Sequence, residues 1–272
     1  HGQPRKTKGG STMMQDDVRF ANSPQDIYEA MWKIPQSNYS LVVMTKEKFE
    51  SIPLRPETKR AYTSDMVSRH LLSEKQAEKA SDAKAKAGRK VSYQDDKDAL
   101  NLEARFSNEG RAKKKELPYL EDMGFDSIIT DESPFFKNSL EAGKNSQGIA
   151  YVPSPRVSNI AMDMAMKSHY IRSKNNGRGV YGLSATPVTN SPIEIFNMLS
   201  LVTSPDEFKR FGVNTVDDFV NIFGDVQDIM KQSVSGEVRS TLGLVGFKNL
   251  DGLRNLFKKY VNVKTVDDVD NE

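Results

Sequence analysis

The segment that decides the fold reads Ser127-Ile128-Ile129-Thr130-Asp131-Glu132. A short apolar run of this kind is typical of a buried strand in a parallel sheet, and this one ends directly in two carboxylates. Two other apolar runs also end in small polar residues, Leu41-Val42-Val43-Met44 before Thr45 and Gly179-Val180-Tyr181-Gly182-Leu183 before Ser184. Because ligands of open α/β sheets bind beyond the carboxyl ends of the strands, we expect these polar ends to share one edge.

Helical patterns lie between and after the predicted strands. Apolar residues at helical spacing predict a helix over about 156–173 that would cover the sheet. Ser191-Pro192-Ile193-Glu194 has a serine cap, a proline in the first helical position and a glutamate three residues after the serine, so a helix should run from here to about residue 202. Two more helices are expected at about 215–223, ended by Gly224, and at about 250–260. The predicted fold class is therefore α/β, a parallel sheet flanked by helices.

Composition excludes several classes of protein. The 272 residues contain no cysteine, which excludes disulfides, thiolate metal sites and a cysteine nucleophile. The three histidines show no metal-ligand spacing. A net charge of +2 neither requires nor excludes a nucleic-acid partner. No apolar run approaches the length of a membrane span, and the first residues lack the apolar stretch of a signal peptide, so we expect a cytoplasmic location without a membrane partner.

The carboxylates at 131 and 132 suit one particular chemistry. In phosphoryl transfer from a nucleotide, a strand-end aspartate can hold Mg²⁺ while a neighbouring carboxylate orients and deprotonates the attacking water. Hydroxyls in Leu183-Ser184-Ala185-Thr186-Pro187 could bond these carboxylates and sense the γ-phosphate. Each segment alone also fits a plain alternative, since acidic pairs are common in surface loops and Ser, Thr and Pro are common in turns.

Taken in order, these segments resemble the Swi/Snf-type group of superfamily 2 helicases and translocases. Asp131-Glu132-Ser133-Pro134-Phe135-Phe136-Lys137-Asn138 resembles motif II, and Gly182-Leu183-Ser184-Ala185-Thr186-Pro187-Val188-Thr189-Asn190 resembles motif III. Tyr39-Ser40-Leu41-Val42-Val43-Met44-Thr45 is similar to motif Ib, and Phe257-Lys258-Lys259-Tyr260-Val261 to the passage out of the first lobe. The tracts 38–56 and 174–179 are most similar to those of the very large methylase-helicase and antirestriction-type proteins of phages and mobile elements.

The resemblance implies a partial RecA-like lobe with a helical charged insertion. In that arrangement, residues 1–24 are a flexible end, 25–56 the first part of the lobe and 57–116 the insertion. Motifs II and III occupy 117–205, and 206–272 form a helical extension toward a second lobe. The basic cluster at 111–115 could touch phosphates, although a charge run is more often a solvated face.

The resemblance also implies cofactors, partners and site residues. The intact parent protein would use ATP and Mg²⁺ and act on nucleic acid, with double-stranded DNA as the expected form, together with its own N-terminal part and second lobe. The catalytic residues would be Asp131, Glu132, Ser184 and Thr186. Asp131 would also bind the metal ion, and Asp131 and Glu132 would both contact the cofactor. The residues nearest the nucleic acid would be Thr45, Lys46, Lys137, Asn138 and Asn190.

Two departures from the family pattern keep alternatives open. Pro134 replaces a residue whose side chain would hydrogen-bond, and no Gly-x-x-x-x-Gly-Lys-Ser/Thr loop is present to hold phosphates, so tight ATP binding by this chain alone is not expected. The leading interpretation is an inactive piece of an ATP-dependent DNA translocase. The alternative is a non-catalytic scaffold or DNA-binding module. A Mg²⁺-dependent phosphatase or nuclease ranks last, because it needs more strand-end carboxylates.

Overall fold

The computed structural model describes residues 5–6, 12–13, 24–66, 68–69, 117–140, 146, 148–152, 158–186, 193–232, 236–264 and 268. They belong to two compact units, one drawn from residues 1–53 and 113–124 and the other from 54–112 and 125–272. Most of the expected flexible end at 1–24 and residues 70–116 of the expected insertion lie outside the described residues. No described helix combines the length and the apolar character needed to cross a membrane.

The first unit consists of short elements. The strands β1 (Arg5–Lys6) and β2 (Thr12–Met13), each two residues long, pair in antiparallel fashion. The helix α1 (Pro24–Lys33) continues into the 3-10 turn η2 (Ile34–Gln36). The helix α2 (Lys46–Ser51) follows, and η3 (Leu120–Asp122) returns to this unit through a bond of 2.9 Å from the Leu120 N–H to the Pro53 carbonyl oxygen.

The prediction of a strand at residues 41–44 is wrong. These residues adopt no regular structure, and Leu41 and Val43 are 74% and 85% exposed. The physical reason is that an apolar run becomes a buried strand only when a neighbouring strand takes up its hydrogen bonds, and none of the described strands pairs with this run.

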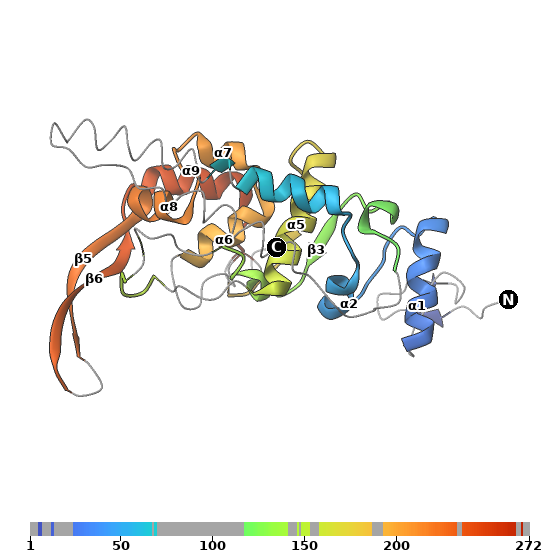
Figure 1. The fold of residues 1–272 in the computed structure, drawn as a ribbon, viewed down its shortest axis with the longest axis horizontal. Helices are drawn as coiled ribbons and strands as arrows, with labels where there is room; N and C mark the ends of the chain where they lie inside the picture. Colours follow the sequence, from blue (N-terminus) through green and yellow to red (C-terminus); the bar gives the residue numbers. More distant parts are fainter. Residues whose placement is uncertain are drawn as a thin grey trace. The chain divides into compact units, whose positions relative to one another are not determined.

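The second unit contains the parallel pair that the sequence predicts. The strand β3 (Ile128–Thr130) pairs with β4 (Val180–Gly182) in a register that places Ile128 opposite Val180 and Thr130 opposite Gly182. The crossover between them carries α5 (Asn159–Lys174), which packs against β4 and against α6 (Ile193–Val202). Figure 1 shows α5 beside β3. The predicted α/β class, a parallel pair flanked by helices, is confirmed.

One glycine fixes the start of β4. Gly179 has a φ of 99°, and a Cβ atom there would lie 2.6 Å from the Asp126 carbonyl oxygen. Its own carbonyl accepts the Ile128 N–H at 2.8 Å, which closes the ladder between the two strands. Only glycine combines this backbone conformation with so close an approach.

The main core lies among the C-terminal helices. It joins α6 to α7 (Pro205–Lys209), α8 (Val216–Phe223) and α9 (Leu250–Tyr260). The rings of Phe196 and Phe208 lie 5.0 Å apart, and Phe219 lies 5.0 Å from Phe196 and 5.2 Å from Phe223. The helix α8 begins with a capping box, in which Thr215 and Asp218 bond each other's backbone N–H. The helices predicted at about 156–173, from Ser191-Pro192 to about 202, at about 215–223 and at about 250–260 are confirmed within the described residues as α5, α6, α8 and α9.

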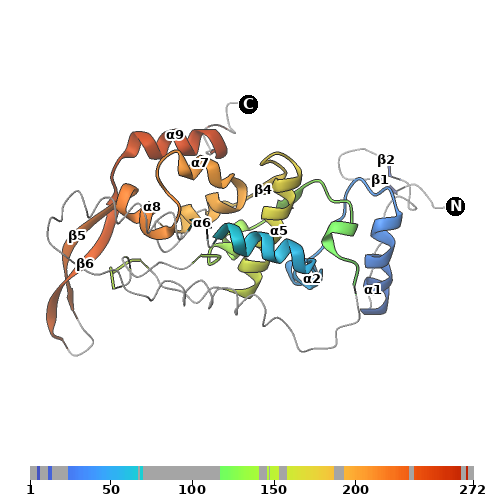
Figure 2. The ribbon, with the colours of Figure 1, turned by 45° about the horizontal axis from the view of Figure 1, so that its top comes forward.

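A long antiparallel ribbon was not predicted. The strands β5 (Gly224–Gln232) and β6 (Val238–Phe247) form it, and Figures 1 and 2 both show it extending beyond α8 and α9. Gly224 ends α8, as expected, and begins β5. A Cβ atom there would lie 2.5 Å from the Val220 carbonyl oxygen and 2.8 Å from Leu244 Cδ1. The region 206–272, expected as a helical extension, is therefore mixed helix and ribbon.

Candidate active site at two strand ends

Backbone hydrogen bonds tie the two predicted motifs together at the carboxyl ends of β3 and β4. The Leu183 N–H donates to the Thr130 carbonyl oxygen at 2.8 Å, and the Leu183 carbonyl oxygen accepts the Ser133 N–H at 2.9 Å. The Thr130 hydroxyl also donates to the Tyr181 carbonyl oxygen at 3.3 Å. Leu183 therefore bonds on both sides of the acidic pair and directly precedes Ser184, so the acidic and hydroxyl segments leave the same edge of the sheet.

Both carboxylates at this edge are exposed, and one stands on an unusual backbone. Glu132 has φ 53° and ψ 50°, the left-handed region that residues other than glycine rarely adopt. The Asp131 carboxylate accepts the Glu132 N–H at 3.1 Å. A left-handed residue reverses the chain sharply, so the Asp131 and Glu132 side chains are presented at the strand end instead of continuing along it.

Behind the acidic pair, the chain packs tightly against β4. A Cβ atom on Gly182 would lie 3.0 Å from Ser133 Cβ and 3.1 Å from its hydroxyl oxygen. Ser133 is 2% exposed, and its hydroxyl has no hydrogen-bond partner among the described residues. This buried serine belongs to the site and was not predicted. The signal that could have found it is the small residue Gly182 on the paired strand, which leaves room for it.

The hydroxyl segment turns immediately after β4. Ser184 is half-buried and its hydroxyl oxygen accepts the Thr186 N–H at 3.0 Å, while Thr186 itself is exposed. This bond is the local turn that serine commonly makes. It holds Ser184 at the strand end but engages one of its two lone pairs, so the hydroxyl can still donate.

An ion pair anchors the end of the acidic segment to α6. The 3-10 turn η4 (Ser133–Phe136) leads into Lys137, whose ammonium lies 2.8 Å from the Glu194 carboxylate. The side chains are 20% and 6% exposed, so the pair is largely out of water. The Asn197 amide also donates to the Lys137 carbonyl oxygen. Two side chains of α6 thereby fix the chain that carries the carboxylates.

The other residues predicted near nucleic acid are placed as follows. The Asn138 carbonyl oxygen accepts the Ser158 N–H at 3.1 Å, which joins the end of the acidic segment to the start of α5. Thr45 belongs to the first unit, where its hydroxyl caps α2 by accepting the Lys48 N–H, and Lys46 lies 4.0 Å from Glu47. Asn190 lies outside the described residues.

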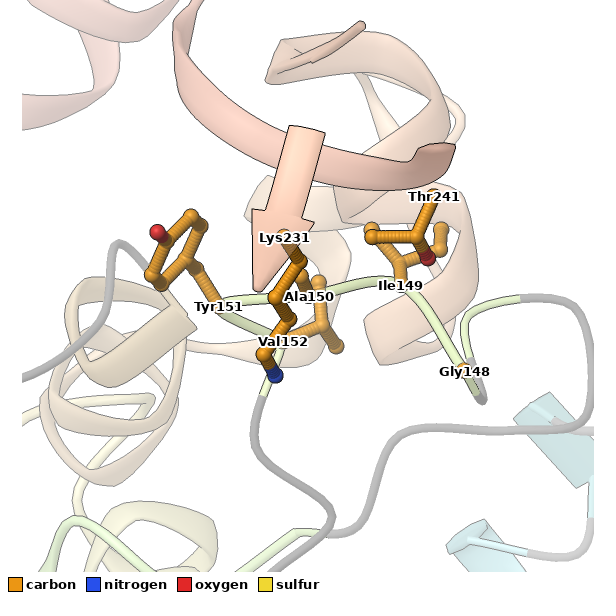
Figure 3. A pocket seen from close by; sticks show the side chains of 7 residues that line it. All are labelled: Gly148, Ile149, Ala150, Tyr151, Val152, Lys231 and Thr241. Carbon is orange, nitrogen blue, oxygen red and sulfur yellow. The ribbon is translucent and has the colours of Figure 1, made fainter. Parts of the chain in front are cut away.

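An open pocket lies in the second unit, away from the two strand ends. It has a volume of about 450 Å³ and is lined by residues 148–152, Lys231 and Thr241. Ala150 joins this segment to the ribbon, because its N–H donates to Leu242 at 2.8 Å and its carbonyl accepts from Leu244 at 2.9 Å. Figure 3 shows the Lys231 side chain extending toward Val152. One ammonium and the hydroxyls of Tyr151 and Thr241 on a mostly apolar wall do not form a converging set of phosphate donors.

The fold and this edge define a helicase-like α/β class: paired parallel strands, covered by helices, with carboxylates and hydroxyls at their carboxyl ends. The chain belongs to the family described as "Probable helicase domain", whose model matches residues 14–265. It is also similar to the "Defense against restriction protein B" of Escherichia phage P1, at 38% identity over 269 residues. That match covers 99% of this chain and 12% of the phage protein. No solved structure matches the chain significantly.

These comparisons confirm a helicase-like family with a phage antirestriction relative, as the resemblance had indicated.

Among the residues that the structure describes, no group of three or more His, Asp or Glu side chains is arranged to hold a metal ion.

Proposed function

We propose that this chain is the part of a Swi/Snf-type, ATP-dependent DNA translocase that carries motifs II and III. The observation that supports it is the pairing of β3 with β4, which brings Asp131-Glu132 and Ser184-Ala185-Thr186 to one edge through the bonds of Leu183. Family membership gives independent support for a helicase-like role. The phosphate-binding loop and the second lobe would come from other segments of a larger polypeptide.

In this proposal, each strand-end side chain has a distinct role. Asp131 would supply one carboxylate ligand to Mg²⁺, an ion that binds through one or two carboxylates and otherwise keeps waters and substrate phosphates. An exposed carboxylate at a rigid strand end can serve as such a ligand, and the protein does not have to supply all the ligands of the ion. Mg²⁺ would neutralise charge on the ATP phosphates. Glu132 would accept the proton of the attacking water, and Ser184 and Thr186 would link the carboxylates to the neighbouring strand.

The nucleic-acid contacts belong to the same proposal. Thr45, Lys46, Asn138 and Asn190 would meet the sugar-phosphate backbone of duplex DNA. Lys137 is proposed with them, and its ammonium lies 2.8 Å from Glu194, so a phosphate would have to compete with that carboxylate. Since the antirestriction relative is a phage protein, the site of action would be the bacterial cytoplasm.

The decisive experiment changes Glu132 in the larger protein that contains this chain. Glu132→Gln keeps the shape of the side chain but removes its basicity, so we expect duplex-stimulated ATP hydrolysis to fall by about 10²- to 10⁴-fold. The matched control is Glu237→Gln, which alters an exposed carboxylate on the ribbon and should leave turnover unchanged. Unchanged thermal unfolding would show that both variants keep the fold. Full turnover in Glu132→Gln would remove this residue from the role of base.

One observation favours a second candidate, a non-catalytic DNA-binding scaffold. Pro134 is the second residue of η4 and has no side-chain group that could couple nucleotide state to the hydroxyl segment. A scaffold would bind duplex DNA with an affinity that falls steeply with salt, but would show no ATP turnover in the larger protein. DNA-stimulated turnover in that protein would exclude the scaffold.

A further inference from the structure

A small, partly enclosed cavity in the second unit is lined by more polar than apolar residues. Its volume is about 20 Å³, enough for one water molecule or one monatomic ion. It is lined by residues of the helical stretches 56–66 and 68–69, of α5 and of the C-terminal end of α6, together with Ser139 and Leu140. The polar side chains that line it are Tyr62, Arg69, Ser139, His169, Arg172 and Ser200.

Both guanidinium groups are only partly satisfied. Arg69 donates through Nη2 to Asp65 at 2.6 Å, and Arg172 donates through Nη1 to the carbonyl oxygens of Ser200 and Leu201 at the end of α6. The Nε atoms of Arg69 and Arg172 are buried and have no partner among the described residues. The same holds for the Ser139 hydroxyl, on a residue that is 1% exposed. Buried N–H groups that stay unpaired cost free energy, so a ligand is expected there.

The charge around the cavity is positive. Two guanidinium groups line it, and among the described residues Asp65, the partner of Arg69, is the acidic side chain beside them. No carboxylate is among the described residues that line the cavity itself. Burial lowers the pKa of His169, so its imidazole is neutral at pH 7 and does not add a cation, and burial raises the pKa of Tyr62 to about 12, so its phenol stays protonated.

We propose that this cavity is a binding site for a small monovalent anion of the halide class, held by the Nε–H groups of Arg69 and Arg172 and by the Ser139 hydroxyl. The two Nε–H groups and the Ser139 hydroxyl can all donate to one acceptor, and a halide accepts without having to donate. A water molecule could accept from the same groups, but unlike a halide it does not offset the positive charge of the two guanidinium groups. The anion would link α5, the helical residues 56–66 and 68–69, and the segment after the acidic pair.

The direct test is diffraction from crystals of this chain grown or soaked in sodium bromide, recorded at the bromine absorption edge. We expect an anomalous peak in the cavity at positions within hydrogen-bonding reach of both Nε atoms. A cavity with density for water but no anomalous signal would overturn the proposal.

A solution test uses the same chain at constant ionic strength, with bromide replacing gluconate. We expect a saturable rise of roughly 2 to 5 °C in the unfolding midpoint. Ser139→Ala should weaken the bromide dependence several-fold, and Arg69→Gln should abolish it. Arg239→Gln on the ribbon is the control and should keep it. Equal midpoints in bromide and gluconate for the wild-type chain would refute the site even if a variant failed to fold.

Discussion

Single glycines decide how closely β3 and β4 approach. Gly179 combines a φ of 99° with a close contact to Asp126, and Gly182 leaves room for the buried Ser133. Both lie in the segment that begins β4 and leads to Ser184. Their function is steric, since a side chain at either position would push apart the backbone that presents the carboxylates.

Gly179→Ala should therefore destabilise the second unit. The new methyl group would meet a backbone oxygen at 2.6 Å in a conformation that alanine avoids, and we expect a loss of about 2 to 3 kcal/mol in the free energy of unfolding. Gly246→Ala on β6 is the matched control, because a Cβ atom there meets nothing within 4 Å. Denaturant unfolding of the two variants checks the prediction. Equal stability would show that the Gly179 backbone can relax.

At this scale the sequence predicted the positions of the candidate residues better than their contacts. Asp131, Glu132 and Ser184 were expected at strand ends because apolar runs precede them. Those runs do form paired strands, whereas the run before Thr45 does not. The left-handed backbone of Glu132 and the ion pair of Lys137 could not be predicted, because both depend on how α6 packs behind the acidic segment. No local pattern in the chain specifies that packing.

Among the elements, α6 links the acidic segment to the main core. It carries Glu194 and Asn197, which hold Lys137, and on another face Phe196, which packs into the aromatic cluster. A disturbance at the Lys137 pair should thus change both the stability of the core and the position of the carboxylates.

Lys137→Met should be destabilising, by about 3 kcal/mol, because it removes the cation that lies 2.8 Å from the buried Glu194 carboxylate. The double variant Lys137→Met with Glu194→Leu removes both charges and should recover most of that loss. The comparison is made by denaturant unfolding. A double variant no more stable than Lys137→Met would mean that lost packing, and not the lost attraction between the two charges, causes the effect. The exposed pair of Lys209 and Asp206 provides a control, since Lys209→Met should change stability by less than about 1 kcal/mol.

Elements with a clear period were predicted well and the others were not. The helices α5, α8 and α9 have apolar residues at helical spacing, and α8 also has a capping box, so their existence followed from local rules. The ribbon was missed because β5 mixes polar and apolar residues without strict alternation, although Gly236 and the run after it were a usable hairpin signal. The expected strand at 41–44 failed for the opposite reason, since apolar character alone does not provide a pairing partner.

For the whole molecule, acid stability should depend on the cluster of Tyr62, Asp65 and His169. Burial is the largest influence on His169 and lowers its pKa below the ordinary value of 6.5, while Asp65, 3.8 Å away, opposes this. As the pH falls below 6.5, His169 is protonated in the unfolded chain before it is protonated in the folded one. The folded state therefore loses stability until the pH passes below the pKa of His169 in the fold.

His169→Gln should remove that part of the pH dependence. We expect the wild-type chain to lose more unfolding free energy than the variant between pH 7.5 and pH 5.5, at one fixed salt composition. The free energy of unfolding of both chains is measured with urea at each pH. The variant also loses the ring contact with Tyr62, but this loss is the same at both pH values and so cancels when each chain is compared with itself. Parallel pH profiles would show that His169 titrates normally in the fold.

The pairing of β3 with β4 also has a consequence for synthesis of the protein. Thr130 and Tyr181, which share a hydrogen bond across the pair, are separated by 51 positions in the chain. At the usual speed of ribosomes, the first strand waits about 3 to 10 s before its neighbour has been made. During that interval Ile128 and Ile129 are an unpaired apolar segment of the nascent chain, a natural binding site for a chaperone.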